Sequence, residues 1–171
     1  MLSNKNFGQL EQITGQTRGL PNAAFTTDEF LNLENQRLFA GSWILAGIAS
    51  EIPNRGDVQP VDVGGRSLIL IRDNNAEIRV FQNVCPHRGA RLVDDRVDGT
   101  NALICPYHSW TFELDGRLQG RPHYFGPGKH DRGDTSNDPI CLFEVCSHIW
   151  CDWCLSISTV GHRLSKTTCV P

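Results

Sequence analysis

The sequence predicts a mainly β protein: one small antiparallel β-domain with an N-terminal helical arm. Three observations support this fold class. The chain has 171 residues, a length typical of a single domain with its own core. From Trp43 onward, short runs rich in β-branched and aromatic residues alternate with Gly, Asn and Asp turn signals. Before Trp43, one segment has the cap and the apolar spacing of a helix.

The N-terminal arm is expected to contain this helix. The first residues, up to Leu20, are mostly polar and contain glycine, so we expect a loosely ordered start. Thr26 and Glu29 have the spacing of a capping box, in which Thr26 reaches forward and Glu29 reaches back. The helix is then expected to run as far as Gly41. Its rough apolar face is formed by Phe30, Leu31, Leu33, Leu38 and Phe39.

The β-rich part is divided into hairpins by short turn signals. We expect strands from Val58 to Val63, from Ser67 to Arg72 and from Glu77 to Gln82. Gly and Asn or Asp at successive positions favour the tight turns that join antiparallel strands. The predicted turns are Gly64-Gly65, Asp73-Asn74-Asn75, Asp98-Gly99 and Asp115-Gly116.

Composition excludes several classes of partner. The net charge is −3, so neither nucleic acid nor an anionic membrane surface is expected to bind. The longest apolar runs, 43–49 and 68–71, are far too short to span a bilayer, and no secretory signal is visible. We therefore expect a cytoplasmic protein. Its cysteines are odd in number, seven, which without an export signal favours reduced thiols and metal ligands over disulfides.

Two short motifs predict a metal centre. They are Cys85-Pro86-His87 and Cys105-Pro106-Tyr107-His108, each placed after a predicted strand. Two thiolates and two imidazoles suit a 2Fe–2S cluster of Rieske type, in which two cysteines hold one iron and two histidines the other. Imidazoles place less negative charge on the cluster than thiolates, so its potential rises to roughly −150 to +300 mV, against about −400 mV for plant-type clusters. The predicted ligands are Cys85, His87, Cys105 and His108.

Residues next to the predicted ligands influence the conformation of the ligand loops. The proline after each cysteine fixes φ and stiffens its loop. Gly89 fits either an ordinary turn or a loop whose backbone N–H groups approach cluster sulfur. Pro122 fits either plain loop punctuation or a third loop that covers the site.

Zinc is the main alternative metal, because a Cys2His2 set also suits a tetrahedral zinc site. Zinc fingers usually pair cysteine with cysteine and histidine with histidine, whereas each motif here mixes the two. A second candidate zinc site lies in the cysteine-rich stretch that begins at Cys141, but we favour a strand-rich segment with cysteines as small apolar fillers. The candidate zinc ligands there are Cys146, His148, Cys151 and Cys154. His123, His130 and His162 are assigned no metal role.

Beyond the ligand spacing, the chain resembles the Rieske domain of Rieske non-heme iron oxygenases, the α-subunits of ring-hydroxylating oxygenases. C-P-H-R-G at 85–89 and C-P-Y-H-S-W at 105–110 carry the resemblance, which covers residues 25–155. The further similar segments are 28–43, 65–68, 80–85, 110–112, 115–118 and, as closing strands, 143–145 and 150–157. This resemblance implies a Rieske-type (ISP-like) fold. We expect an arm and helix at 1–42, the domain at 43–158 and a tail of other origin at 159–171.

The resemblance also implies a role in electron transfer. In the family, the 2Fe–2S cluster accepts electrons from a ferredoxin or an NAD(P)H-dependent reductase and passes them to mononuclear Fe(II) in a C-terminal domain. That iron supports O2-dependent hydroxylation or demethylation, usually in a neighbouring subunit of a trimer. The D-x2-H-x4-H pattern of that domain is absent from these 171 residues. We therefore expect a missing catalytic domain, no oxygenase activity from this chain alone, and a homotrimer only in a full-length form.

Other Rieske classes resemble the chain less. In those of the respiratory and photosynthetic complexes, each ligand loop carries an additional cysteine, where this chain has Ala90 and Tyr107. Stand-alone Rieske ferredoxins share the ligand pattern but generally lack a helical arm. Beyond Ser158, the ending fits a premature stop, a frameshift or a gene fragment. Three hypotheses stay open: part of an oxygenase α-subunit, a stand-alone Rieske ferredoxin-type electron carrier, or a zinc-binding structural module.

Overall fold

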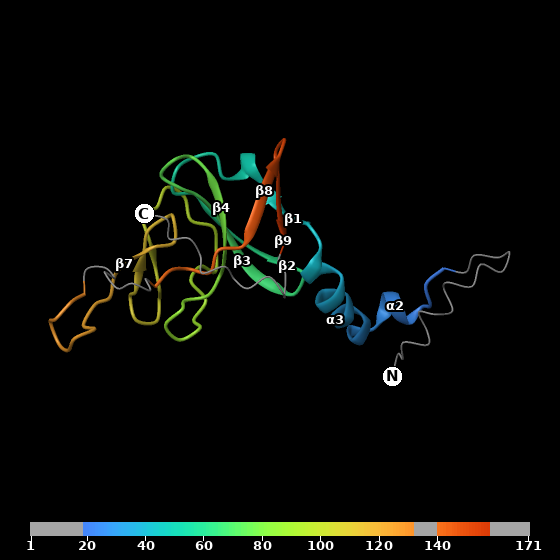
Figure 1. Ribbon diagram of the computed structural model, residues 1–171, viewed down its shortest axis with the longest axis horizontal. Helices are drawn as coiled ribbons and strands as arrows, with labels where there is room; N and C mark the ends of the chain where they lie inside the picture. Colours follow the sequence, from blue (N-terminus) through green and yellow to red (C-terminus); the bar gives the residue numbers. More distant parts are fainter. Residues whose placement is uncertain (1–18, 132–139, 158–171) are drawn as a thin grey trace. The chain divides into compact units, whose positions relative to one another are not determined.

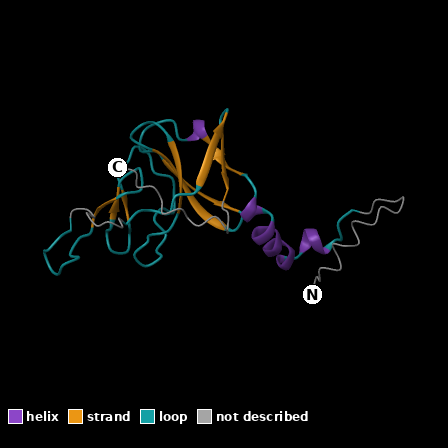
Figure 2. Ribbon diagram, in the orientation of Figure 1, coloured by secondary structure: helices purple, strands orange, loops and turns teal. Residues whose placement is uncertain are grey.

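The computed structural model describes residues 19–131 and 140–157. These residues form short helices followed by three three-stranded antiparallel sheets (Figure 1, Figure 2). The predicted mainly β fold class with an N-terminal helical arm is therefore confirmed. The helical elements are α2 (Ala23–Thr26), α3 (Asp28–Arg37), η1 (Phe39–Gly41) and η2 (Ala49–Glu51). The strands are β1 (Ile44–Ile48), β2 (Val58–Val63), β3 (Arg66–Arg72), β4 (Ile78–Gln82), β5 (Leu103–Ile104), β6 (Thr111–Phe112), β7 (Leu118–Gly120), β8 (Cys146–Trp150) and β9 (Trp153–Ile157).

The chain divides into two compact units, one ending at Leu33 and one beginning at Glu34. The predicted division at 42–43 and 158–159 stays a prediction, since residues 1–18 and 158–171 lie outside the described part. No helix in the described part is long and apolar enough to cross a membrane.

The start of α3 corrects the predicted helix cap by one residue. The hydroxyl oxygen of Thr27, rather than Thr26, accepts a hydrogen bond from the Phe30 N–H at 3.3 Å. Thr26 lies at the end of α2 and donates its hydroxyl proton to a backbone carbonyl of the preceding turn. The helix also ends earlier than predicted, at Arg37, and Phe39–Gly41 forms the separate 3-10 turn η1. A hydroxyl in either position satisfies a free N–H, so spacing alone did not choose between them.

The central sheet has the order β2-β3-β4, and its hairpins were correctly predicted. The β2–β3 turn consists of Gly64 and Gly65, both with positive φ of 57° and 74°, the conformation that a two-residue hairpin turn demands. In the β3–β4 turn, the Asp73 carboxylate accepts the Asn75 N–H at 2.8 Å. Both turns therefore formed where local residue chemistry favoured them.

Strand β3 separates two hydrophobic cores. Its residues from Leu68 to Ile71 are all buried, which a run of consecutive apolar residues predicts for a strand covered on both faces. Leu68 and Leu70 belong to a smaller core that includes residues of β1 and β9. Ile69 and Ile71 belong to a larger core that includes residues of β5, β6 and β7. The central sheet thus packs against a different sheet on each face.

The sheet β1-β9-β8 joins parts of the chain that are far apart in sequence. Strand β9 lies between β1 and β8, with Ile48 opposite Trp153. The Asp152 carboxylate fixes the β8–β9 turn by accepting the Ser50 N–H at 2.8 Å and the Ser50 hydroxyl at 2.6 Å. The closing strands were expected at 143–145 and 150–157, but they lie at 146–150 and 153–157. The shift arises because residues 150–153 form the turn that pairs the two strands.

The predicted hairpin at Asp98-Gly99 is wrong. Among the described residues, the only β pairing in this stretch is an isolated bridge between Val97 and Val58. Gly99 has a φ of 63°, as a turn requires, but its N–H donates to the Asp57 carboxylate at 3.1 Å. The turn therefore anchors a loop to a buried carboxylate instead of joining two strands. The Asp115-Gly116 hairpin is confirmed between β6 and β7.

Stability should depend on pH through Asp57, which is 1% exposed. The backbone N–H of Asn54 lowers the pKa of this carboxyl, opposed by burial and assisted by Gly99 and Arg96. A lowered pKa means that the folded state binds the proton more weakly than the unfolded state does. The stabilisation is therefore present above the unfolded pKa and is lost as pH falls through the folded pKa. We expect Asp57→Asn to lower stability by about 2 kcal/mol at neutral pH and much less in acid.

Urea unfolding from neutral pH to about pH 3 measures this difference. Asp95→Asn is the matched control, because Asp95 is exposed. If the Asp57→Asn variant and the wild type differed by the same free energy at every pH, the assigned role of Asp57 would be wrong.

Candidate metal centre

The first predicted ligand motif forms a loop that closes on its own cysteine. The Cys85 N–H donates to the Ala90 carbonyl oxygen at 2.7 Å, and the Gly89 N–H donates to the Cys85 carbonyl oxygen at 2.9 Å. Gly89 has a φ of 71°, which favours glycine. Of its two predicted roles, the structure supports the ordinary turn, because its N–H bonds a carbonyl oxygen.

The second motif repeats this backbone structure. The Cys105 N–H donates to the Trp110 carbonyl oxygen at 2.8 Å, and the Ser109 N–H donates to the Cys105 carbonyl oxygen at 2.9 Å. Ser109 has a φ of 56° and occupies the place that Gly89 has in the first loop. The two loops thus present their cysteines in the same way, although their histidines stand two and three residues after the cysteine.

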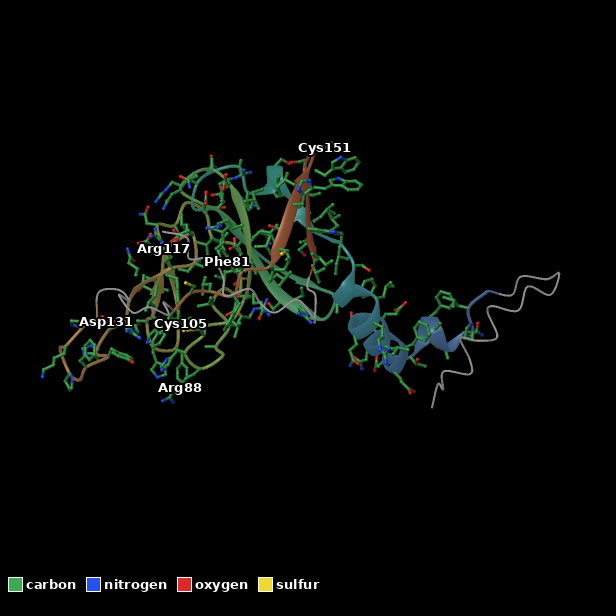
Figure 3. All side chains as sticks on the ribbon, in the orientation of Figure 1. Phe81, Arg88, Cys105, Arg117, Asp131 and Cys151 are labelled. Carbon is green, nitrogen blue, oxygen red and sulfur yellow. The ribbon has the colours of Figure 1, made fainter. Side chains whose placement is uncertain are left out.

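The four predicted ligand residues form two pairs, one of thiols and one of imidazoles. Cys85 and Cys105 are each 1% exposed and belong to the larger core, and both thiols are free. His87 is half-buried and His108 is exposed, with ring centroids 4.8 Å apart and planes at 71°. Thiols toward the core and imidazoles toward solvent form a donor set that fits two irons with unlike ligand pairs. Cys105 and the neighbouring Arg88 are labelled in Figure 3.

The surroundings of Cys85 favour a thiol in the metal-free chain. Burial raises the pKa of Cys85 to about 11, and the adjacent Cys105 thiol acts in the same direction. The backbone N–H groups of His87 and Arg88 oppose this effect by hydrogen bonding toward the sulfur. Because a metal ligand must be the thiolate, binding has to release the Cys85 proton, and these two amides then stabilise the anionic sulfur.

Both imidazoles are supported by aromatic rings. Burial lowers the pKa of His87, and His108 and Arg88 lower it further, which favours the neutral form that binds metals. Trp110 stacks on His87 with ring centroids 4.4 Å apart and planes at 7°. Tyr107 packs against His108, with centroids 3.9 Å apart. These contacts restrict the orientation of both rings before any metal binds.

Asn83 holds the first loop against the central sheet. Its side-chain oxygen accepts the Leu92 N–H at 3.1 Å and the Val93 N–H at 3.0 Å, and its amide donates to the Val93 carbonyl oxygen at 2.7 Å. The loop from 85 to 91 is therefore tied at both ends. Sequence reasoning missed this role, because an asparagine before a cysteine does not indicate which residues will be its hydrogen-bond partners.

The comparison with protein families identifies the kind of domain that contains the two loops. The model of the Rieske [2Fe-2S] domain matches residues 42–125, which include both ligand loops and all three central strands. Residues 42–125 are a Rieske domain. The residue pattern, the antiparallel sheets and the family match agree, as the resemblance implied.

Curated relatives of this Rieske domain are oxygenase subunits. The chain is 37% identical over 145 residues to the carnitine monooxygenase oxygenase subunit of Escherichia coli strain K12, covering 85% of this chain and 39% of that protein. It is 41% identical over 104 residues to the large oxygenase component of salicylate 5-hydroxylase from Ralstonia sp., covering 60% and 25%. The chain thus spans well under half of the length of these relatives.

Solved structures give the same picture. A quaternary ammonium Rieske monooxygenase in complex with L-carnitine aligns with a TM-score of 0.67 at 26% identity, covering 84% of this chain and 39% of that one. Naphthalene 1,2-dioxygenase from Rhodococcus sp. aligns with a TM-score of 0.76 at 26% identity, covering 92% and 36%. The Rieske-type fold is therefore shared with both a monooxygenase and a dioxygenase.

A third loop, which contains Pro122, contacts Trp110 at the end of the second ligand loop; that this loop covers the site stays a prediction. It runs from Arg121 to Asp131, whose backbones pair through hydrogen bonds of 2.9 and 3.0 Å. Tyr124 lies edge-on to Trp110, with centroids 6.3 Å apart. The loop projects beyond β7 in Figure 1. Trp110 thus contacts both His87 and this loop, which residue spacing in the sequence did not predict.

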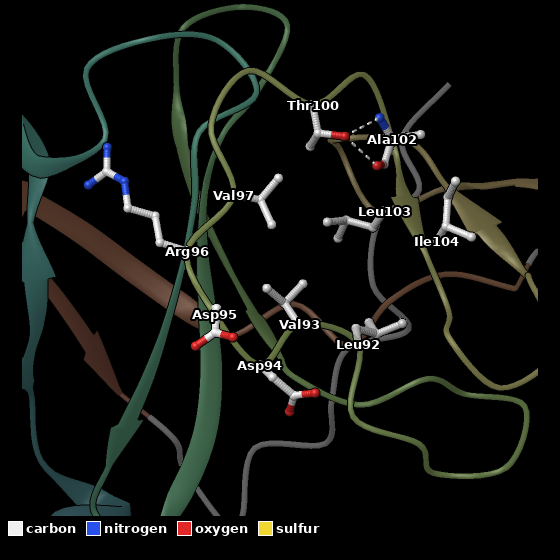
Figure 4. Close-up of a pocket in the computed structure, with 10 residues that line it drawn as sticks. All are labelled: Leu92, Val93, Asp94, Asp95, Arg96, Val97, Thr100, Ala102, Leu103 and Ile104. Carbon is white, nitrogen blue, oxygen red and sulfur yellow. Dashed lines mark hydrogen bonds between the residues drawn. The ribbon is translucent and has the colours of Figure 1, made fainter.

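One pocket of about 300 Å³ lies beside the site but does not contain it. Its wall is the segment that connects the two ligand loops, from Leu92 to Ile104 (Figure 4). Apolar side chains such as Val93 and Leu103 alternate there with the charged groups of Asp94 and Arg96. None of the four predicted ligands lines it.

The second predicted zinc site is not assembled within the described residues. Nowhere in them do three or more His, Cys, Asp or Glu side chains gather to hold one metal ion. The predicted 2Fe–2S ligands are no exception, since they meet as one pair of thiols and one pair of imidazoles. Cys154 is fully buried in the smaller core, where burial raises its pKa to about 11, and it acts as the predicted apolar filler. Cys146 and Cys151 are free and exposed, and Cys151 lies at the far end of the β8–β9 hairpin from Cys105 (Figure 3). Cys141 is half-buried and forms an isolated β-bridge with Arg117.

Proposed function

We propose that this Rieske domain relays single electrons in an oxygenase subunit, with Cys85 and Cys105 as ligands of one iron and His87 and His108 as ligands of the other. The observation that carries the proposal is the pair of equivalent loops, which bring two buried thiols and two adjacent imidazoles together. The Rieske match over residues 42–125 supports the same assignment. A 2Fe–2S cluster bound there supplies one-electron redox chemistry.

The residues around the predicted ligands have separate roles in stabilising charge, excluding water and admitting electrons. The N–H groups of His87 and Arg88 stabilise negative charge on the Cys85 sulfur. Trp110 covers one face of His87 and keeps water from it. His108 is the exposed ligand, so its ring edge offers the shortest route for an electron to or from a partner protein. A ferredoxin or an NAD(P)H-dependent reductase is the proposed donor.

The oxygenase context is favoured over a stand-alone electron carrier. Similarity to the carnitine monooxygenase subunit extends over 145 residues, well beyond the Rieske domain at 42–125. A carrier would need only the domain itself. In this context the acceptor is mononuclear Fe(II) in a further domain, and a homotrimer is the proposed assembly of the full-length form. Inter-subunit electron transfer is described for the quaternary ammonium Rieske monooxygenase.

The role proposed for this chain is the electron-transfer step. The relatives named above act on carnitine and salicylate, and naphthalene 1,2-dioxygenase shares the fold. Because these substrates differ so much, we propose that substrate selectivity resides outside the electron-accepting domain that these proteins share. Oxygenation, demethylation and a cytoplasmic location are accordingly properties proposed for the full-length protein.

Anaerobic redox titration of the purified 171-residue chain tests the proposal. Iron and sulfide analysis should give two of each per chain. Stepwise addition of dithionite should bleach the visible absorption as a one-electron process, at a potential of roughly −150 to +300 mV. A chain that binds zinc stoichiometrically and neither bleaches nor becomes paramagnetic would instead be the zinc-binding structural module. Potentials near −400 mV would indicate all-cysteine ligation and contradict the role of the histidines.

A further inference from the structure

A buried ion pair lies next to Trp110, the residue that stacks on His87. The Arg121 Nε–H donates to an Asp131 carboxylate oxygen at 2.6 Å, and an Arg121 terminal nitrogen lies 2.5 Å from the same oxygen. The side chains are only 9% and 13% exposed. Their charges are therefore weakly screened compared with those of a surface ion pair.

Aromatic rings connect this ion pair to a predicted cluster ligand. The guanidinium carbon of Arg121 lies 3.8 Å from the ring centroid of Tyr124 and 5.4 Å from that of Trp110. Trp110 in turn stacks in parallel on His87 at 4.4 Å. Trp110 is therefore in contact with both the guanidinium of Arg121 and the imidazole of His87. Cation–π attraction holds the guanidinium over the rings, and the carboxylate of Asp131 fixes its direction.

We propose that Arg121 and Asp131 are positioning residues that set the electrostatic environment of His87 through Trp110. The inference rests on the proposed role of His87 as an iron ligand. In the wild type, the cation beside Trp110 and the carboxylate beyond it nearly cancel. Together they orient Trp110 against His87 and keep the reduction potential of the site at an intermediate value.

Stability alone does not explain why a buried ion pair occurs at this position. Well-packed apolar replacements of such pairs are often neutral or stabilising, because desolvation offsets the Coulomb attraction. The base of this loop is also closed independently, by the two backbone hydrogen bonds between Arg121 and Asp131. The charges are therefore not required to close the loop, which leaves their effect on the adjacent site as their distinctive contribution.

Removing the charge of Arg121 and removing that of Asp131 should shift the reduction potential of the cluster in opposite directions. Reduction adds one electron, supplied by dithionite in the titration, to the cluster beside His87. Arg121→Gln leaves an unpaired carboxylate, which opposes the added negative charge and should lower the potential. Asp131→Asn leaves an unpaired guanidinium, which favours the added charge and should raise it. Arg121→Lys keeps the positive charge and should restore the potential toward that of the wild type.

The measurement is the midpoint potential of the reconstituted full chain, with the paramagnetic spectrum of the reduced form recorded beside it. The double variant Arg121→Gln with Asp131→Asn restores neutrality and should return close to the wild-type potential. Arg117→Gln is the matched control, because the exposed Arg117 pairs with Asp115 at 2.8 Å on the β6–β7 turn. It should leave the potential unchanged.

The outcomes separate this inference from the proposed function. If the wild type binds no 2Fe–2S cluster, the proposed function fails and the inference fails with it. If the wild type binds the cluster but both single variants shift the potential in the same direction, or neither shifts it, the inference alone is overturned. Opposite shifts, with the double variant near the wild type, would support it, since packing damage has no reason to change sign with charge. If a single variant fails to bind the cluster, the test instead compares Arg121→Lys with the double variant. The inference requires these two variants to have equal midpoint potentials, and unequal potentials would overturn it.

Discussion

Replacing His108 by alanine is expected to abolish the visible absorption and the paramagnetic signal of the reduced chain. His108 is exposed, so its side chain contributes little to the core and the fold should survive the change. One iron would lose one of its two imidazole ligands, and an incompletely held cluster is released or decomposes. Iron content should fall from two atoms per chain to near none. Far-ultraviolet circular dichroism, measured on the same sample, reports whether the sheets are intact.

The control for this change is His148→Ala. His148 is likewise an exposed histidine, but it lies on β8, in the sheet that contributes to the smaller core. Its replacement should leave iron content and both spectra unchanged. Unaltered spectra in the His108→Ala variant would show that the ligand assignment is wrong.

Gly56→Ala is expected to cause the largest loss of stability among conservative glycine substitutions. A Cβ atom at this position would lie 2.1 Å from the Thr100 carbonyl oxygen, and the φ of 83° is itself unfavourable for alanine. The Gly56 carbonyl oxygen also accepts the Thr100 N–H at 2.9 Å, so the two backbones cannot separate without breaking that bond. Strain and forced separation together should cost about 3–5 kcal/mol. Urea denaturation of the metal-free chain measures this loss directly.

Gly99→Ala separates the two causes. Gly99 has a comparable φ of 63°, but a Cβ there would meet nothing within 4 Å. Its substitution should therefore cost only the left-handed strain, about 1–2 kcal/mol. Equal losses for the two variants would mean that backbone crowding at Gly56 contributes nothing.

Local chemistry made much of the fold predictable. Gly64-Gly65 required a tight turn, and the run from Leu68 to Ile71 required a strand buried on both faces. These features depend on a few neighbouring residues, whose allowed conformations are set by sterics and side-chain volume. The prediction at Asp98-Gly99 failed because the same turn chemistry also suits a loop anchored to Asp57. Which use prevails depends on a carboxylate about 40 residues away in the chain.

The candidate site was predictable in its members and not in its surroundings. Cysteine and histidine have metal chemistry of their own, so Cys85 and His108 could be selected from type and spacing. Trp110, Arg121 and Asp131 have no such signature. Their relation to His87 exists only because the base of the third loop packs against Trp110 in the folded chain.

The sequence by itself determined a mainly β chain with paired Cys and His motifs, because turns, strand patterns and metal ligands are short-range properties. Only the tertiary structure decided that β9 inserts between β1 and β8, that Cys154 fills a core, and that a buried ion pair lies next to Trp110. Those features join residues far apart in the chain. Their free energy comes from packing, desolvation and charge pairing, which exist only after the chain has folded.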